Sequence, residues 1–158
     1  MTSSLFSYNK SKVIQALRYH FITRKEIRLM MILVNIFAIT SAALFFLKKI
    51  SPLAFLTGSV LWFSLMIAFW FILPYTIYKR AATFKDHFIV SFQDNHLFLE
   101  NERGSKSWPW TAFSSFIESP HFFHLYFDTR SFFLIPKEAF AKEDIDDVRR
   151  ELKLKIKN

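Results

Sequence analysis

Two long runs without a charged residue constrain this chain more than any other feature. The first occupies residues 29–47, and the second begins at residue 53 and continues to residue 78. At about 1.5 Å per helical residue, the first run extends roughly 28 Å, which is close to the ~30 Å hydrocarbon core of a bilayer. The rest of a 158-residue chain is too short to cover two such helices with a polar shell. The sequence therefore predicts a transmembrane hairpin with spans at 29–47 and 53–73 and a turn at 48–52.

Polar and aromatic residues within these runs refine that prediction. Pro74 is expected to end or kink the second helix near the membrane interface, where Trp70 and Tyr75 suit an aromatic belt. Asn35 either lines a pathway or bonds across the helix pair, and the second role is the commoner one for such residues. Neither span contains an acidic residue, a basic residue or a histidine, so transport by two helices alone is not expected.

Basic residues flank the outer ends of the hairpin. Nine Lys or Arg lie near the outer ends of the two spans, between residues 10 and 28 and between residues 79 and 85, whereas two lie in the turn. The positive-inside rule therefore predicts that both termini lie in the cytoplasm and that the turn faces outside. We therefore expect a multi-pass membrane protein, and a turn this short displays no external receptor domain.

The formal net charge of +8 is distributed unevenly. Residues 1–28 carry six Lys or Arg and one Glu, whereas residues 79–158 carry thirteen basic and twelve acidic residues. A domain that binds nucleic acid should show a basic face on its folded part, so nucleic acid is not expected as a partner. The chain has no cysteine, which excludes disulfides and thiolate metal sites.

The segment before the first span has two pieces. Residues 5–8 are expected to form a short strand, and Ser11 is expected to cap a helix that begins at the next residue. Val13, Leu17 and Phe21 fall on one face of that helix. Such a basic amphipathic helix either lies on anionic headgroups or packs on the C-terminal domain, and the sequence leaves both readings open, with packing favoured.

Beyond residue 79 the pattern is that of strands. Phe88, Val90 and Phe92 alternate with less apolar residues, and Trp108 and Trp110 point the same way if the chain there is extended. Further short strands are expected at residues 114–118, 122–127 and 131–135. Because these strands are close in sequence, an antiparallel meander is the simplest topology.

The chain ends in a pattern typical of a helix. Ile145, Val148, Leu152 and Ile156 are spaced to share one face. Acidic residues fill the first turns and basic residues, as far as Lys157, fill the last, which complements the helix dipole. This order explains the acidic cluster better than a metal site does.

Three stretches of this domain resemble the C-terminal domain of YcxB-like proteins. They are residues 110–113, 122–126 and 133–140, and the similarity is sharpest over residues 135–140. The resemblance implies a bacterial inner-membrane protein of undefined activity, with a short N-terminal segment, two membrane helices and this small domain. It also implies a fold related to bacterial pleckstrin-homology-like (PH-like) domains. The expected fold class is therefore membrane α+β: a transmembrane hairpin with a small antiparallel β-meander domain closed by a C-terminal helix.

Physical roles follow for the residues of these stretches. Pro136 removes a ladder donor and ends the last strand, and Phe140 is expected to fill the core where the helix begins. Trp110 and Phe113 are expected to anchor the strand before them, and Trp110 is also a candidate for contact with a ligand or lipid. The candidate interaction or structural residues are Trp108, Trp110, Phe113, Pro136, Lys137, Phe140 and Asn35.

No enzymatic constellation is recognisable in the sequence. His121 and His124 are three apart on an expected strand, so they face opposite sides and cannot share a metal. The two glycines, Gly58 and Gly104, lie in a span and in a turn, so there is no phosphate-binding loop. We therefore predict no catalytic residue, no metal site and no cofactor, and we do not expect an enzyme.

Two functions are compatible with these features. In the first, the hairpin tethers a cytoplasmic interaction module that binds a protein partner or a lipid headgroup. In the second, the chain is an accessory subunit or assembly factor of a larger membrane complex and acts through its spans, as Asn35 and the small residues there suggest. The expected partners are the lipid bilayer and either another protein or a second copy of the chain.

Overall fold

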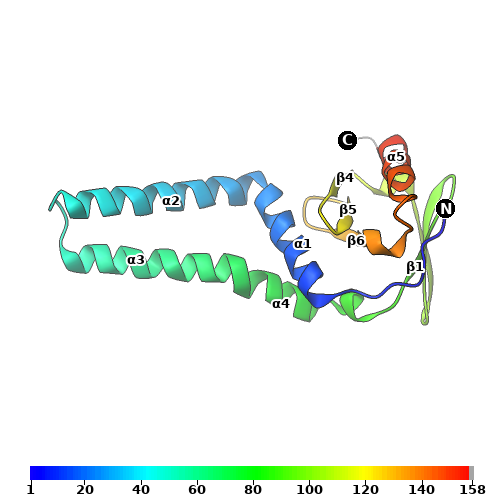
Figure 1. Cartoon of the computed structure of the whole chain (residues 1–158), viewed down its shortest axis with the longest axis horizontal. Coiled ribbons are helices and arrows are strands. Elements are labelled where there is room, and N and C mark those ends of the chain that lie inside the picture. The colour runs from blue at the N-terminus through cyan, green and yellow to red at the C-terminus, as the bar shows by residue number, and fades with distance from the viewer. Residues whose placement is uncertain (157–158) are drawn as a thin grey trace. The chain divides into compact units, whose positions relative to one another are not determined.

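The computed structural model describes residues 1–156 and forms two compact units (Figure 1). One unit combines Met1–Ala16 with Ala81–Asn158, and the other is Leu17–Arg80. The first sixteen residues therefore fold with the C-terminal part of the chain. Lys157, expected in the last turn of the terminal helix, lies outside the described residues.

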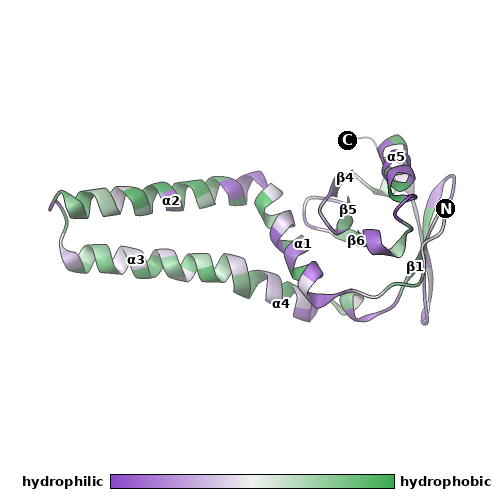
Figure 2. Ribbon diagram, viewed as in Figure 1, coloured by the Kyte–Doolittle hydropathy of each residue, from purple (hydrophilic) through white to green (hydrophobic). Residues whose placement is uncertain are grey.

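The second unit contains the expected pair of apolar helices. Helix α2 spans Lys25–Phe46 and helix α3 spans Pro52–Ile67, and the two run side by side in opposite directions (Figure 1). Hydrophobic residues cover nearly the whole length of both (Figure 2). Each helical stretch is long and apolar enough to cross a membrane, and none of the residues of α2 or α3 is buried within the protein.

A tight connection joins the two helices. Lys48 adopts a left-handed backbone conformation, with φ of 54°. The Ser51 hydroxyl accepts a hydrogen bond of 3.2 Å from the backbone N–H of Ala54, and Pro52 occupies the first helical turn. Both are favourable signals for a helix start. Phe45 and Phe55 then stack with ring centroids 4.5 Å apart, which closes the hairpin at this end.

The second apolar helix continues through Pro74 rather than ending there. After α3 the chain forms a π-helical turn at Ala68–Ile72 and then helix α4 at Leu73–Arg80. Proline disrupts a regular α-helix because its nitrogen carries no hydrogen and its ring meets the preceding turn. The π-helical turn just before Pro74 is the local irregularity by which this helix accommodates it.

Helix α1 spans Lys10–Thr23 and crosses from one unit into the other. The Oδ1 atom of Asn9 accepts hydrogen bonds from the backbone N–H groups of Ser11 and Lys12, at 3.0 and 3.2 Å. The prediction that Ser11 caps this helix was therefore wrong, because Asn9 caps it from an earlier position. Val13 is fully buried in the first unit, so the first half of the helix packs with that unit.

The segment before α1 follows the edge of a sheet without forming a regular strand. It makes only isolated bridges, between Thr2 and Ser91 and between Phe6 and Phe88. The strand expected at residues 5–8 is therefore absent from the described structure. The hydroxyl of Tyr8 donates a 2.7 Å hydrogen bond to the carbonyl oxygen of Leu134, which ties this segment to the interior of the first unit.

Six strands in the first unit form two separate antiparallel sheets of three. The first sheet contains β1 (Ile89–Phe92), β2 (His96–Asn101) and β3 (Gly104–Pro109), and the second contains β4 (Ser115–Glu118), β5 (Phe122–Tyr126) and β6 (Phe132–Pro136). Each sheet is a meander in sequence order, so the expected topology holds within each sheet. The two meanders are separated by a 3₁₀ turn at Trp110–Ala112.

Aromatic side chains fill the space between the two sheets. Phe133 of β6 lies 6.1 Å from Phe88 and 5.6 Å from Trp108, measured between ring centroids. Helix α5 (Ile145–Lys155) completes the unit, as expected. Its apolar face is buried at Val148 and Leu152, and Ile156 just beyond it is buried too. The domain is thus two small sheets and a terminal helix around one aromatic core.

Candidate functional site

Trp110 and Phe113 anchor the turn that leads from the first sheet to the second. Trp110 is 6 % exposed, and its Nε1 atom donates a 2.9 Å hydrogen bond to the carbonyl oxygen of Gln93. Phe113 is 5 % exposed and stacks on Phe127 with ring centroids 4.9 Å apart. Trp110 lies in a 3₁₀ turn, so the extended chain on which a shared face of Trp108 and Trp110 depended does not continue to this residue. Trp110 and Phe113, the two buried residues, therefore have packing roles.

Trp108 is the more accessible of the two tryptophans. It is half-buried on β3, where its ring lies 5.6 Å from that of Phe133. The Nζ atom of Lys106, an exposed residue of the same strand, lies 5.2 Å from the centre of the same ring. A cation over an aromatic face stabilises weakly at an exposed position. Trp108 therefore joins the aromatic core to the surface of the first sheet.

Pro136 and Phe140 mark the two ends of the turn after β6. Pro136 is the last residue of that strand and pairs with Phe122, and the 3₁₀ turn Lys137–Ala139 follows at once. Phe140 is buried and meets the ring of Phe92 edge-on, with centroids 5.9 Å apart. Pro136 thus ends the strand and Phe140 lies in the core, as the sequence suggested, although helix α5 begins only at Ile145.

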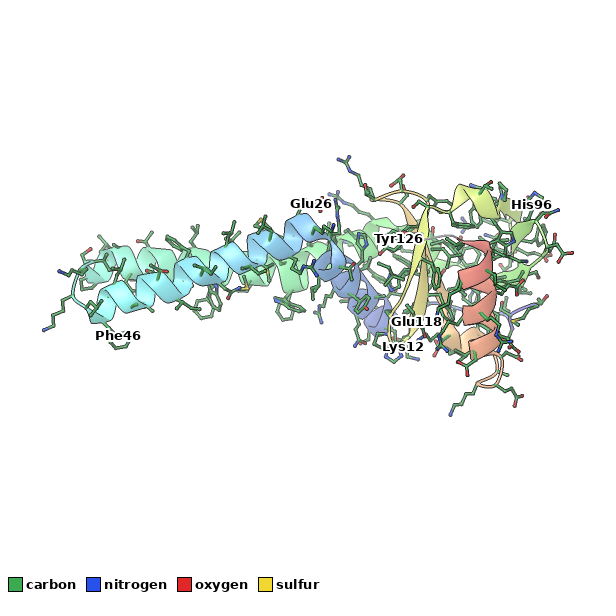
Figure 3. All side chains as sticks on the ribbon, turned by 90° about the horizontal axis from the view of Figure 1, so that it is seen from above. Lys12, Glu26, Phe46, His96, Glu118 and Tyr126 are labelled. Atoms are coloured by element: carbon green, nitrogen blue, oxygen red, sulfur yellow. The ribbon has the colours of Figure 1, made fainter. Side chains whose placement is uncertain are left out.

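Lys137 belongs to an ion-pair network centred on Glu118, a residue that Figure 3 labels. The Nζ atom of Lys137 lies 2.6 Å from Glu118 Oε1. Arg149 approaches the same carboxylate with two donors, Nε and Nη2, each at 2.7 Å. The network joins β4, the turn after β6 and helix α5. The network contributes to the stability of the domain, and the positive charge of Lys137 is paired within it.

This arrangement holds Glu118 in its ionised form. Hydrogen bonds from Arg149, followed by those from Lys137, lower the pKa of Glu118 from 4.5 to about 2, against the opposing effect of burial. Bidentate arginine and lysine partners both favour the charged carboxylate. The sequence pointed to Lys137 alone. Glu118 and Arg149 are 31 residues apart, so no local spacing indicates that they meet.

His124 is a titratable group in the interior of β5. It is fully buried, and its Nε2 atom lies 2.8 Å from the hydroxyl of Ser119. His121, by contrast, is exposed. Across residues 1–156, no three His, Asp or Glu side chains gather closely enough to hold a metal ion.

Polar residues in the apolar helices bond within their own helix. The amide of Asn35 donates a 2.7 Å hydrogen bond to the carbonyl oxygen of Met31. The hydroxyls of Thr57, Ser59 and Ser64 each donate to the carbonyl four residues earlier. The prediction that Asn35 bonds across the helix pair was therefore wrong, because its amide donates within its own helix.

Arg18 makes a contact that the sequence did not reveal. Its Nε atom donates a 2.8 Å hydrogen bond to the carbonyl oxygen of Trp70, in the π-helical turn. Its guanidinium carbon also lies 5.9 Å from the centre of the Trp70 ring and 5.3 Å from that of Phe71. The only hint of this contact in the sequence is Pro74, which has no backbone N–H to donate to the carbonyl oxygen of Trp70. That signal does not say which distant residue supplies the replacement.

An apolar pocket adjoins this contact. Besides Arg18 and Trp70, five apolar side chains from α1, α2 and the π-helical turn line it: Phe21, Ile22, Ile27, Met31 and Phe69. All of these residues belong to the Leu17–Arg80 unit. Arg18 is the only charged residue among those lining it, which combines one cation with a hydrocarbon surface.

These observations define a chain with two helices fit to cross a membrane and a separate small α+β domain. The model of the YcxB-like protein family matches residues 92–152, from the end of β1 into α5. This part of the chain is therefore a YcxB-like domain, as the resemblance predicted. No curated protein and no solved structure matches the chain.

Proposed function

We propose that this chain is a membrane-tethered interaction module. In this proposal the hairpin crosses the cytoplasmic membrane with both termini inside. The YcxB-like domain is held at the inner surface, where it binds a protein partner or a lipid headgroup. One observation carries the proposal: none of the residues of the apolar helices α2 and α3 is buried within the protein.

The exposure of these helices supports lipid rather than water as their solvent. Ile39, Phe46 and Leu53 are 71 %, 84 % and 73 % exposed. Soluble monomers rarely expose a contiguous apolar patch larger than a few hundred Å², whereas here both helices are apolar along their length. Lipid is the environment that such helices prefer.

The domain supports a binding role better than a catalytic one. Its conspicuous polar and aromatic groups are engaged in packing, as the Glu118 network and the Trp110 indole illustrate. Two antiparallel meanders closed by a terminal helix also support the proposed kinship with PH-like domains. Such a domain presents a surface on a stable core.

Membrane topology is the first test. The full chain should resist extraction by alkaline carbonate and dissolve in mild detergent. Cysteines introduced singly at Lys49 and Lys142 should differ in labelling: a membrane-impermeant maleimide should reach position 49, but not position 142, in intact cells. A chain that stays monodisperse without detergent, or one labelled at position 142 from outside, would overturn the proposal.

A second candidate function acts through the spans themselves. Small residues of both helices line a groove along the hairpin: Ala38, Ser41, Ala42, Gly58 and Ser59. Such residues allow another helix to approach closely, which favours an accessory subunit of a larger membrane complex.

Replacing both spans with unrelated apolar helices separates the two candidates. Partners cross-linked to the domain in the native membrane should be retained after the exchange if the domain is the binding element. If they are lost while the domain remains folded and membrane-bound, the span-dependent function is correct instead.

A further inference from the structure

The base of the hairpin combines an apolar pocket with a cation in one place. The pocket lined by Phe21, Ile27, Met31 and Phe69 is apolar apart from Arg18 and the backbone near Trp70. In the proposed topology it lies at the cytoplasmic end of the spans. Aromatic residues such as Trp70 favour the headgroup level of a bilayer, so the pocket would meet the boundary between headgroups and acyl chains.

The guanidinium of Arg18 keeps donors available for a ligand. Within residues 1–156, its only hydrogen bond is the one from Nε to the Trp70 carbonyl. That bond and the neighbouring Trp70 and Phe71 rings fix the plane of the group. Its two terminal amino groups therefore remain as a pre-oriented fork. Planar forks of this kind bind phosphate with two parallel hydrogen bonds.

The surrounding charge favours an anion. Arg24, Lys25 and Arg28 stand at the start of α2, and Lys79 and Arg80 end α4. The single acidic residue of this unit, Glu26, lies 3.9 Å from Arg24 and is 78 % exposed at its side chain. Figure 1 shows the start of α2 and the end of α4 at the same end of the hairpin, away from the connection. Anionic lipids of the cytoplasmic leaflet are attracted to such basic segments.

We propose that this site binds one anionic glycerophospholipid of the cytoplasmic leaflet. Its phosphate lies on the terminal amino groups of Arg18, and part of an acyl chain lies in the pocket lined by Phe21, Ile27, Met31 and Phe69. The proposal rests on the membrane anchoring proposed above. It commits to a lipid rather than free phosphate because a hydrocarbon surface and a cation adjoin each other.

The test uses the full chain purified in a mild non-ionic detergent. Phosphatidylglycerol, phosphatidylcholine and inorganic phosphate are added in turn, and lipid retention is measured by native mass spectrometry with the thermal unfolding midpoint. We expect retention of phosphatidylglycerol over phosphatidylcholine and no effect of phosphate alone. Arg18→Gln should reduce that preference about tenfold, since a hydrogen-bonded charged contact is lost.

A matched variant separates this site from general electrostatic attraction. Arg28→Gln removes the same charge from the same end of the hairpin but lines no part of the pocket, so it should retain most of the preference. A third variant, Arg18→Lys, keeps the positive charge but lacks the planar guanidinium fork. It replaces Arg18→Gln in the test if that variant does not fold. It too should lose most of the preference for phosphatidylglycerol.

Three results would overturn the site. They are equal losses in the Arg18 and Arg28 variants, equal retention of both lipids, and stabilisation by inorganic phosphate that matches phosphatidylglycerol. Each of these leaves the membrane anchoring intact. By contrast, a chain that needs no detergent would refute the proposed function itself, so the two failures are distinguishable.

Discussion

The Nε atom of Arg18 donates a 2.8 Å hydrogen bond to the carbonyl oxygen of Trp70. In a regular α-helix this oxygen would accept from the residue four positions later, which is Pro74. Proline has no N–H to donate. A side chain from α1 therefore supplies a donor at the point where the backbone of the second apolar helix cannot. The same contact fastens α1 to the hairpin.

A double-mutant cycle tests this relationship. Arg18→Gln should lower the free energy of unfolding by about 1–2 kcal/mol, as expected for a charged donor at a partly exposed site. In a Pro74→Ala background the loss should be smaller, because the substituted alanine provides a backbone N–H for the same oxygen. Thermal or denaturant unfolding in detergent measures each variant. Strictly additive effects would show that Arg18 does not compensate for Pro74.

Glu118 should be the most sensitive charged position in the domain. Glu118→Gln weakens its bonds to Lys137 and to Arg149 together, so we expect a loss of about 1–3 kcal/mol in the free energy of unfolding. The exposed Glu102 is the matched control, and Glu102→Gln should change the stability by less than about 0.5 kcal/mol. Chemical unfolding followed by tryptophan fluorescence reports both, and equal effects would contradict a structural network.

Acid should destabilise the protein in two separate steps. Burial, with a smaller contribution from Arg24, lowers the pKa of His20 from 6.5 to about 4. Between these values the unfolded chain binds a proton that the folded chain excludes, so stability falls as pH falls from 6.5 to 4. Glu118, whose pKa is lowered from 4.5 to about 2, adds a second loss, because its contribution is complete above pH 4.5 and disappears toward pH 2.

The variant His20→Asn separates these two steps. The unfolding midpoint of the unmodified chain, measured in detergent from pH 8 to pH 3, should begin to fall near pH 6.5. In the variant the curve should be flatter between pH 6.5 and 4 but should keep the later loss. An unchanged slope in the upper range would assign that step to another group.

Local patterns predicted much of this structure. The apolar helices, the strand positions of the domain and the buried face of α5 all follow from hydrophobic periodicity, which depends only on neighbouring residues. Pairings between distant residues did not follow. Glu118 and Arg149 meet only through tertiary folding, and the partner of the Trp70 carbonyl lies 52 residues away. The division into two sheets depends on a 3₁₀ turn that begins at Trp110. The local sequence Trp-Pro-Trp favoured a continued strand at this point instead of a turn.

The start of α1 shows how two plausible local signals compete, and it gives a further prediction. Ser11 and Asn9 both have side chains suited to helix capping, but only Asn9 accepts from two free backbone N–H groups, those of Ser11 and Lys12. Asn9→Ala should therefore cost about 1 kcal/mol of stability, whereas Ser11→Ala should be nearly neutral or slightly stabilising, because alanine is the better helix former. Denaturant unfolding of the two variants decides between the caps. A larger loss for Ser11→Ala would mean that the helix begins later in the chain, with Ser11 as its cap.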